Sequence, residues 1–254
     1  NFIFALTGVF IFPFISIVYP NWATVIGDGE VYSIVYTVSK DDPNYTVTKN
    51  MQSKLFWNKI LKKYNIPTPR VVCETPTSCG IHEANDVSFI EKPNFGTQGA
   101  GIKEITFDEY KSSNENMILQ KKVTDCFHKG ARHFRIVTRF INDICTISMI
   151  KEFTSQNPNA IASNRVQGGI SKVCENLQCS HLSHTEQNAL SSISKTLTKL
   201  HKNEFKIAPF IGWDVMLTCH GPTVLEGNLG ASMRSDHVFY KSYLTDMKRL
   251  FVLK

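Results

Sequence analysis

A predicted β-hairpin near the end of the sequence constrains the fold most. Apolar and polar residues alternate over 211–218 and 223–227, and a Cys-His-Gly turn separates the two runs. This pairing places Asp214 opposite Glu226, with Asn228 one step along the same face. Carboxylates on facing strands lie with their Cβ atoms about 5 Å apart and repel each other. The hairpin therefore indicates an oxygen-rich Mg²⁺ site, with a solvent-exposed acidic face as the alternative.

The remaining pattern predicts an α+β fold of antiparallel strands with helices set among them. Further strands are predicted at 27–42, 87–91, 117–120, 134–140 and 144–153. A helix at 51–64 has one apolar face and is stopped by an Ile-Pro-Thr-Pro sequence. Two capping boxes predict two more helices, with Thr106 and Glu109 opening a short one and Ser183 and Glu186 a long one.

The composition excludes several classes of protein. The chain has 254 residues with 42% hydrophobic and 20% charged residues, which excludes global disorder. Its net charge of +6 is mild and dispersed, so a nucleic-acid binder is disfavoured. An anionic small molecule such as a nucleotide suits the same charge.

The cysteines are odd in number and irregularly spaced. Seven in a chain of this length predict reduced thiols before a disulfide framework. A zinc site is the alternative, and its candidate ligands are Cys73, Cys79, His82, Cys174, Cys179, His181 and His184. The intervening spacings of five and four residues differ from those typical of zinc knuckles, so buried or loop thiols are favoured.

Residues 1–49 form an N-terminal segment that begins with an uncharged, apolar run. Residues 2–19 have about the minimum length for crossing a bilayer, which indicates a membrane anchor or targeting segment. Pro13 interrupts the run, and its Phe, Ile and Val content suits two short buried strands equally well. The expected location is accordingly cytoplasmic or membrane-associated.

A glycine-rich segment follows the predicted strand 87–91. Gly96, Gly99 and Gly101 fall within six residues, just after Lys92. The backbone amides of such a loop can surround phosphate oxygens, and the lysine adds a point charge. The glycine spacing differs from that of the Walker A, protein-kinase and Rossmann loops, and a ligand-free turn is the alternative.

Three further cations are candidates for an anion site. Lys54 lies on the first predicted helix, Arg135 lies in the strand sequence His-Phe-Arg-Ile-Val-Thr, and Arg165 lies in Ser-Asn-Arg-Val-Gln-Gly-Gly. A solvated helix lysine and arginines paired with local carboxylates are the alternatives.

Four features follow one another along the chain: the helix lysine before Ile-Pro-Thr-Pro, the Lys-Pro strand end with its glycine loop, the Asp strand and the Glu-Gly-Asn strand. Together, in this order, they resemble the ATP-grasp superfamily. The resemblance covers about residues 50–235. The motif sequences Ile-Gly-Trp-Asp, Leu-Glu-Gly-Asn and Gln-Gly-Gly look most like those of the sugar-transfer-associated branch, and more distantly like those of D-alanine–D-alanine ligase. The chain departs from the family pattern at Ser53, Gln120 and His133, where acidic residues are common.

The resemblance implies two α+β lobes, residues 50–122 and 123–254, that hold ATP between them. The N-terminal domain that such ligases usually carry is expected to be missing or reduced to residues 1–49. Two Mg²⁺ ions are implied at the acidic hairpin. The implied nucleotide-binding residues are Lys54, Lys92, Gly96, Thr97, Gln98, Gly99, Gly101, Gln120, Lys121, Val123 and His133; the implied metal ligands are Asp214, Glu226 and Asn228; and the implied catalytic residues are Arg135 and Arg165.

The function implied by the resemblance is that of an ATP- and Mg²⁺-dependent ligase. It would join a small-molecule carboxylate to an amine or a sugar-linked acceptor through an acylphosphate. The alternative is an ATP-binding module of sugar transfer or polysaccharide biosynthesis that has no ligase activity of its own.

Overall fold

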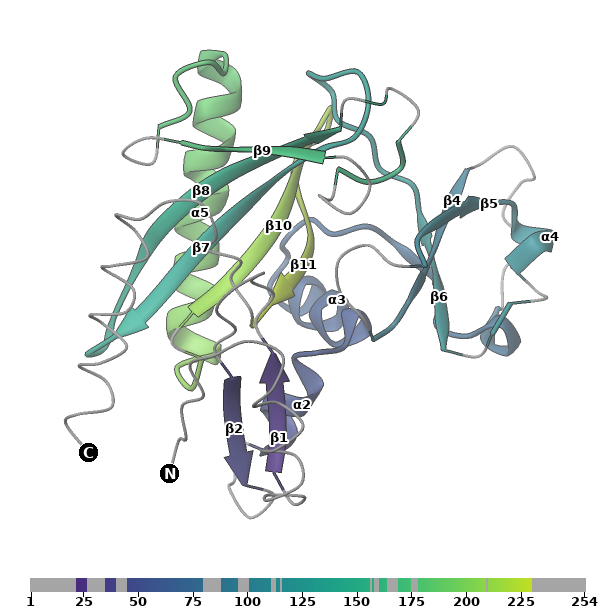
Figure 1. The fold of residues 1–254 in the computed structure, drawn as a ribbon, viewed down its shortest axis with the longest axis horizontal. Helices are drawn as coiled ribbons and strands as arrows, with labels where there is room; N and C mark the ends of the chain where they lie inside the picture. Colours follow the sequence, from purple (N-terminus) through teal and green to yellow (C-terminus); the bar gives the residue numbers. More distant parts are fainter. Residues whose placement is uncertain are drawn as a thin grey trace.

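A computed structural model of the chain describes residues 22–26, 35–39, 45–79, 88–95, 101–110, 113–114, 116–155, 157, 160–163, 169–174, 178–208 and 210–229 (Figure 1). Over these residues the strands form three sheets in which every pairing is antiparallel. Helices accompany the sheets, so the predicted α+β class is confirmed. The apolar segment 2–19 lies outside the described residues.

The largest sheet has five strands in the order β11-β10-β7-β8-β9. The strands are β7 (Arg132–Ile141), β8 (Ile144–Ser155), β9 (Gly169–Val173), β10 (Phe210–Thr218) and β11 (Gly221–Asn228). Strands β7 and β10 are neighbours although helix α5 (His184–Glu204) and two strands separate them in sequence. Helix α5 packs across one face of this sheet (Figure 1).

The capping box that was predicted to open α5 is present. The Ser183 hydroxyl accepts a hydrogen bond from the Glu186 amide, and the Glu186 carboxylate accepts one from the Ser183 amide. Its apolar stripe of Leu190, Ile193, Leu197 and Leu200 is buried. This stripe follows the helical repeat, so the face toward the sheet could be predicted from sequence.

A second sheet has four strands in the order β3-β6-β4-β5. Its strands are β3 (Val71–Cys73), β4 (Phe89–Pro93), β5 (Lys103–Ile105) and β6 (Met117–Lys121), with the short helices η1 (Pro76–Ser78) and α4 (Phe107–Tyr110) beside them. One face of the sheet buries a small core of Cys73, Phe89, Phe107, Tyr110 and Leu119. The opposite face carries Ile90, Lys92 and Gln120.

The third sheet is a pair of short strands, β1 (Trp22–Ile26) and β2 (Val35–Ser39), next to helix α2 (Tyr45–Asn50). Of the strand predicted at 27–42, the structure describes residues 35–39, and these form β2. None of the helices in the described ranges is long and apolar enough to cross a membrane.

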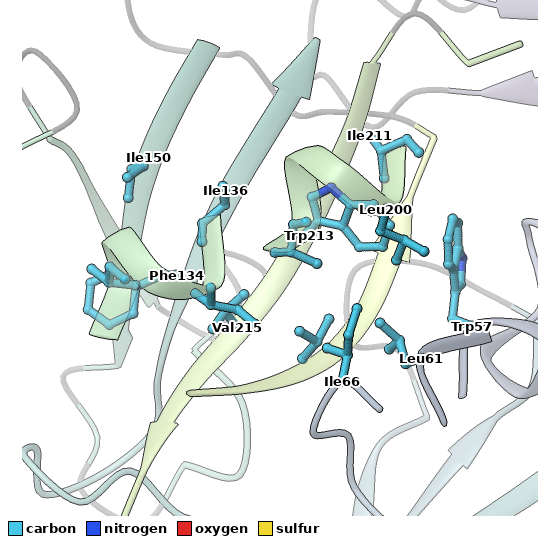
Figure 2. Close-up of a cluster of buried hydrophobic side chains, with 14 of the residues drawn as sticks. Trp57, Leu61, Ile66, Phe134, Ile136, Ile150, Leu200, Ile211, Trp213 and Val215 are labelled. Atoms are coloured by element: carbon cyan, nitrogen blue, oxygen red, sulfur yellow. The ribbon is translucent and has the colours of Figure 1, made fainter. Parts of the chain in front are cut away.

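Helix α3 (Lys54–Lys63) completes the main core. It begins at Ser53, whose hydroxyl accepts from the Phe56 amide, and it ends before Asn65, which adopts a left-handed backbone (φ 54°). Trp57 and Leu61 of α3 pack with residues of α5, β7 and β10 on the covered face of the five-stranded sheet (Figure 2). Helix α3 is thereby fixed against β11.

The prediction of reduced thiols is wrong. Disulfides link Cys73 to Cys79, Cys126 to Cys219 and Cys174 to Cys179. Cys145 is free. Because four of the candidate zinc ligands are oxidised in these bonds, the zinc alternative is excluded as well. The prediction failed because an odd number of cysteines is also compatible with three disulfides and one free thiol.

Candidate functional site

The acidic hairpin has the predicted register. Asp214 of β10 pairs directly with Glu226 of β11. The Asn228 side chain lies between the two carboxylates, since its Nδ2 is 3.2 Å from Asp214 Oδ2 and 3.4 Å from Glu226 Oε1. Three oxygen-bearing side chains thus converge on one face of the sheet, and the opposite face packs on α5.

Helix α3 brings Lys54 to this hairpin. Trp57, one turn along the helix, packs on Gly227, where an added Cβ would lie 2.9 Å from the indole Cε2. The indole also meets Trp213 edge to face, with ring centroids 5.1 Å apart. This packing places the Lys54 ammonium 3.9 Å from Glu226 Oε2, and the side chain is buried.

Asn94, which follows β4, joins the second sheet to the start of α3. Its carbonyl accepts a hydrogen bond from the Lys54 amide at 3.0 Å. Its side-chain Oδ1 accepts from the Leu55 amide at 3.0 Å and from the Ser53 hydroxyl at 2.9 Å. Because Asn94 is two residues beyond Lys92, this junction fixes the end of β4, and hence Lys92, against Lys54.

Lys92 is buried, and it faces the charges of the hairpin. Burial lowers the pKa of its ammonium to about 8, with Glu226 opposing the shift and Lys54 adding to it. A buried lysine near two carboxylates and a second lysine is typical of a site that binds an anion. Gln120, also buried, lies on the same face of the four-stranded sheet, diagonal to Lys92.

On β7 the side chains of Arg135 and His133 face the same hairpin. Arg135 donates two hydrogen bonds to Asp214, from Nε to Oδ1 at 2.8 Å and from Nη2 to Oδ2 at 2.9 Å. Burial alone would raise the pKa of Asp214, but the guanidinium brings it below its usual value. His133 Nε2 lies 3.8 Å from Asp214 Oδ1, and its Nδ1 is 2.6 Å from the Ser163 hydroxyl.

His133 is also held by an aromatic contact. Its ring stacks on Phe153 of β8, with centroids 4.8 Å apart and an interplanar angle of 3°. Burial lowers the pKa of His133, and Asp214 opposes this shift. At neutral pH the imidazole is therefore neutral and can donate or accept a hydrogen bond.

The other predicted residues divide into two groups. Within the described part of the chain, Lys121 is exposed at the end of β6, Val123 is half-buried after it, and Gly101 has a left-handed backbone (φ 75°). The remaining residues, Gly96, Thr97, Gln98, Gly99 and Arg165, lie outside the described residues.

Sequence reasoning missed Asn94, Lys151 and Phe153. Lys151 and Phe153 are two residues apart on β8, and they pair with Arg135 and His133 of β7. Deriving this β7–β8 register from the sequence would have placed both side chains on the site face. Asn94 carried no such signal, because its role depends on the approach of α3.

The acidic set suits a hard divalent cation. It consists of two carboxylates and an amide, and no cluster of three or more His, Cys, Asp or Glu side chains able to hold a metal occurs among the described residues. A rotation of the Asn228 amide would direct its oxygen toward the carboxylate oxygens. Oxygen donors of this kind, with water and phosphate completing the shell, are what Mg²⁺ requires.

No family model matches the sequence, and no curated protein matches it. Solved structures do match. The D-alanine–D-alanine ligase of Helicobacter pylori is similar at a TM-score of 0.55 and 15% identity, over 81% of this chain and 60% of that one. The D-alanyl-alanine synthetase A of Vibrio cholerae gives 0.53 and 16%, over 78% and 61%. The L-amino acid ligase of Bacillus licheniformis gives 0.52 and 15%, over 78% and 44%.

These similarities define the fold. The chain has the ATP-grasp fold, as the order of its four motifs predicted. It spans 44 to 61% of the length of the three ligases named above.

Proposed function

We propose that this protein is an ATP-dependent ligase that activates a carboxylate and transfers it to an amine or related nucleophile. The observation that carries the proposal is the convergence of Lys54 and Lys92 on Asp214, Glu226 and Asn228 where two sheets meet. Phosphoryl transfer requires little beyond neutralised charge and fixed geometry, and these side chains supply both. The names of the structurally similar ligases support the same reaction class.

The nucleotide is assigned to the space between the sheets. Lys54 and Lys92 would bind the α- and β-phosphates, and the loop from Gly96 to Gly101 would cover the β- and γ-phosphates. The adenine would lie along the segment from Gln120 to Val123, mainly against backbone groups. His133 would bind the ribose through a ring nitrogen, in the place where related proteins use an acidic residue.

Asp214, Glu226 and Asn228 would hold the Mg²⁺ ions. When bound, these ions neutralise phosphate charge and orient the γ-phosphoryl group. In the structure Arg135 and Lys54 already neutralise the two carboxylates. The same side chains are therefore positioned to turn toward the nucleotide phosphates.

The proposed reaction has two steps. A carboxylate oxygen of the substrate attacks the γ-phosphorus, the bond to the β-phosphate oxygen breaks, and ADP leaves. The amine then attacks the acyl carbon, loses a proton and displaces inorganic phosphate. Arg135 and Arg165 are assigned to the charge that develops on the acylphosphate and on the tetrahedral intermediate.

The substrates are proposed by chemical class. The activated group is a small-molecule carboxylate, and the acceptor is an amine or a sugar-linked nucleophile. Membership of the sugar-transfer-associated branch is proposed from the amino-acid sequences of the motifs alone. The alternative is an ATP-binding module without ligase activity, which would use the same lysines and metal ligands to bind the nucleotide, so a product assay is needed to separate the two.

The experiment is a product assay. The chain is incubated with Mg²⁺, ATP and pooled carboxylic acids and amines, ADP release is followed, and mass spectrometry identifies the product. Hydroxylamine in place of the amine should trap a hydroxamate. Release of AMP and pyrophosphate would contradict the acylphosphate route, and ATP hydrolysis indifferent to every acid would favour the nucleotide module.

A further inference from the structure

A linker, residues 122–131, connects β6 to β7 and so joins the four-stranded sheet to the five-stranded sheet (Figure 1). Its beginning is attached to the four-stranded sheet. The Lys121 amide, at the end of β6, donates a hydrogen bond to the Arg70 carbonyl at 2.9 Å, and the Lys122 amide donates one to the Ser88 carbonyl at 3.2 Å. The chain is therefore held by the first sheet up to Lys122.

The middle of the linker is attached to the five-stranded sheet at Cys126. A disulfide joins Cys126 to Cys219, which lies in the turn between β10 and β11. The Cys126 amide also donates a hydrogen bond to the Leu217 carbonyl of β10 at 2.8 Å. The linker is thus fixed to the turn of the hairpin whose strands carry Asp214 and Glu226.

Asp125 adds a second attachment to the same sheet. Its side chain is buried, and its two oxygens accept hydrogen bonds from Nε and Nη2 of Arg132 on β7 at 2.8 and 2.9 Å. A paired guanidinium–carboxylate contact of this kind fixes orientation as well as distance. We call the contacts of Asp125 and Cys126 the linker clamp. Only Val123 and Thr124 separate this clamp from the residues that the four-stranded sheet holds.

The disulfide of the linker clamp differs from that of the main core. Cys126 and Cys219 are both exposed, whereas Cys174 and Cys179 are buried among the core residues. An exposed disulfide buries little apolar surface, so its main effect is to restrict the chain segments that it joins. Here the restricted segment is the linker.

The phosphate-binding part of the proposed site is fixed by other contacts. Asn94 connects the end of β4 to the start of α3 and so holds Lys92 against Lys54. Cys219 is five residues from Asp214, which is about 15 Å along an extended strand. The linker clamp can therefore act on residues 120–123 without changing the lysines or the acidic side chains.

We propose that the linker clamp is a positioning element of the nucleotide site, which holds residues 120–123 in the conformation that binds the base. This inference rests on the proposed function, in which the adenine lies along these residues. A binding segment that is already ordered loses less conformational entropy when the ligand binds. The clamp therefore strengthens binding of the adenosine part of ATP and leaves binding of the phosphates unchanged.

The test compares the affinities of AMP-PNP and inorganic tripolyphosphate for the full chain with Mg²⁺, measured by calorimetry. Their ratio reports the contribution of the adenosine part. Two glycines inserted after Thr124 lengthen only the segment between the clamp and residues 120–123, and the disulfide remains. We expect the ratio to fall about tenfold, with unchanged affinity for tripolyphosphate. Cys126→Ser with Cys219→Ser should lower the ratio about threefold, because the Cys126 amide and Asp125 still hold the linker.

Two matched controls accompany these variants. The same two glycines inserted after the exposed Lys129, on the other side of the clamp, should leave the ratio unchanged. Cys174→Ser with Cys179→Ser removes a disulfide elsewhere and should also leave it unchanged. Melting temperatures establish that each variant folds. If the Cys126 and Cys219 variant does not fold, the insertion after Thr124 decides, because it keeps the bond.

An unchanged ratio after the insertion at Thr124, or in a folded Cys126 and Cys219 variant, would overturn the inference. An equal fall in either control would overturn it too, because the effect would then be general loosening of the fold. So would a wild type that binds AMP-PNP no more tightly than tripolyphosphate. Failure of the wild type to bind either compound with Mg²⁺ would instead contradict the proposed function.

Discussion

The indole of Trp57 packs directly against Gly227, at a distance that leaves no room for a side chain. A Cβ on Gly227 would lie 2.9 to 3.0 Å from three ring atoms. Gly227 separates Glu226 from Asn228 on β11, and Trp57 lies one helical turn from Lys54 on α3. The glycine of the Glu-Gly-Asn sequence therefore sets how closely α3 approaches the acidic hairpin, and with it the distance from Lys54 to Glu226.

Gly227→Ala should destabilise the fold and weaken nucleotide binding together. We expect a loss of about 1–3 kcal/mol in the free energy of unfolding, because the added methyl group must displace the indole or the helix. Urea unfolding measures the change. In a Trp57→Leu background the smaller side chain leaves room, so Gly227→Ala should cost much less there. Equal costs in the two backgrounds would show that the contact with Trp57 is not the cause.

Asp214→Asn and Glu226→Gln should each remove Mg²⁺-dependent stabilisation by the non-hydrolysable analogue AMP-PNP. In the wild type, ligand at 100 times its Kd adds about 2.7 kcal/mol, which raises Tm by about 5–10 °C. Thermal denaturation with and without Mg²⁺ checks this. Glu74→Gln is the matched control, since Glu74 forms an exposed ion pair with Lys59 on the surface. An undiminished Tm rise in both site variants would mean that the metal ligands lie elsewhere.

Much of the acidic hairpin could be predicted from sequence because its determinants are local. Alternation over two short strands and a tight turn fix the register, and the structure confirms the pairing of Asp214 with Glu226. The capping box at Ser183 and Glu186 depends on residues three apart and was predicted for the same reason.

The rest depends on contacts between distant segments. Arg135 meets Asp214 because β7 and β10 are neighbours in the sheet, and no local pattern specifies that neighbour. Cys126 and Cys219 are 93 residues apart, so their pairing follows only from the folded positions of the two loops. The role of Arg165 and of the loop from Gly96 to Gly99 stays a prediction.

The disulfides give a prediction about thiols and stability. Without reductant, the unfolded chain should expose one reactive thiol, that of Cys145, and with reductant it should expose seven. Removing the Cys126–Cys219 bond with a double serine variant should cost about 4–5 kcal/mol, because it closes a long loop. The same change at Cys174 and Cys179 should cost only about 2 kcal/mol, because that loop is short.

Thiol titration and urea unfolding measure the two effects. Seven thiols in the absence of reductant would contradict the pairing. A larger cost at Cys174 and Cys179 than at Cys126 and Cys219 would contradict the loop-length argument. The Cys126 amide also donates to the Leu217 carbonyl at 2.8 Å, so the loop keeps one anchor when the bond is removed.

His201 should make stability fall in mild acid. Its Nε2 is 2.7 Å from the Ala208 carbonyl, its Nδ1 is 2.7 Å from the Thr138 hydroxyl, and burial lowers its pKa to about 4. An unfolded histidine titrates near 6.5, so below that pH the unfolded chain binds a proton that the folded chain does not. The free energy of unfolding should therefore fall by about 2 kcal/mol between pH 7.5 and pH 5.

Urea unfolding across this pH range measures the slope. Other groups also titrate, so the contribution of His201 is the difference between wild type and His201→Asn. The variant is expected to be less stable at pH 7.5 and to lose less stability on acidification. Parallel curves for the two proteins would exclude the imidazole as the cause.

Lys92 should stabilise the nucleotide complex and destabilise the free protein. Its pKa falls from 10.5 to about 8 on folding, mainly through burial. Between these values the unfolded chain binds more protons than the folded one, so the free energy of unfolding should rise as pH increases from 8 to 10. At pH 7 the charged lysine costs the free protein up to ~3 kcal/mol, and Lys92→Met should recover much of it.

The same variant should bind ATP far more weakly because a phosphate contact is lost. Lys92→Arg should restore binding only in part, since a planar guanidinium differs from a compact ammonium. Urea unfolding from pH 7 to 10 and calorimetry with Mg²⁺ and AMP-PNP measure the two effects. A Lys92→Met variant that is less stable than wild type at pH 7 would show that the buried ammonium is a structural group. Unchanged affinity for the analogue would show that it is not a phosphate ligand.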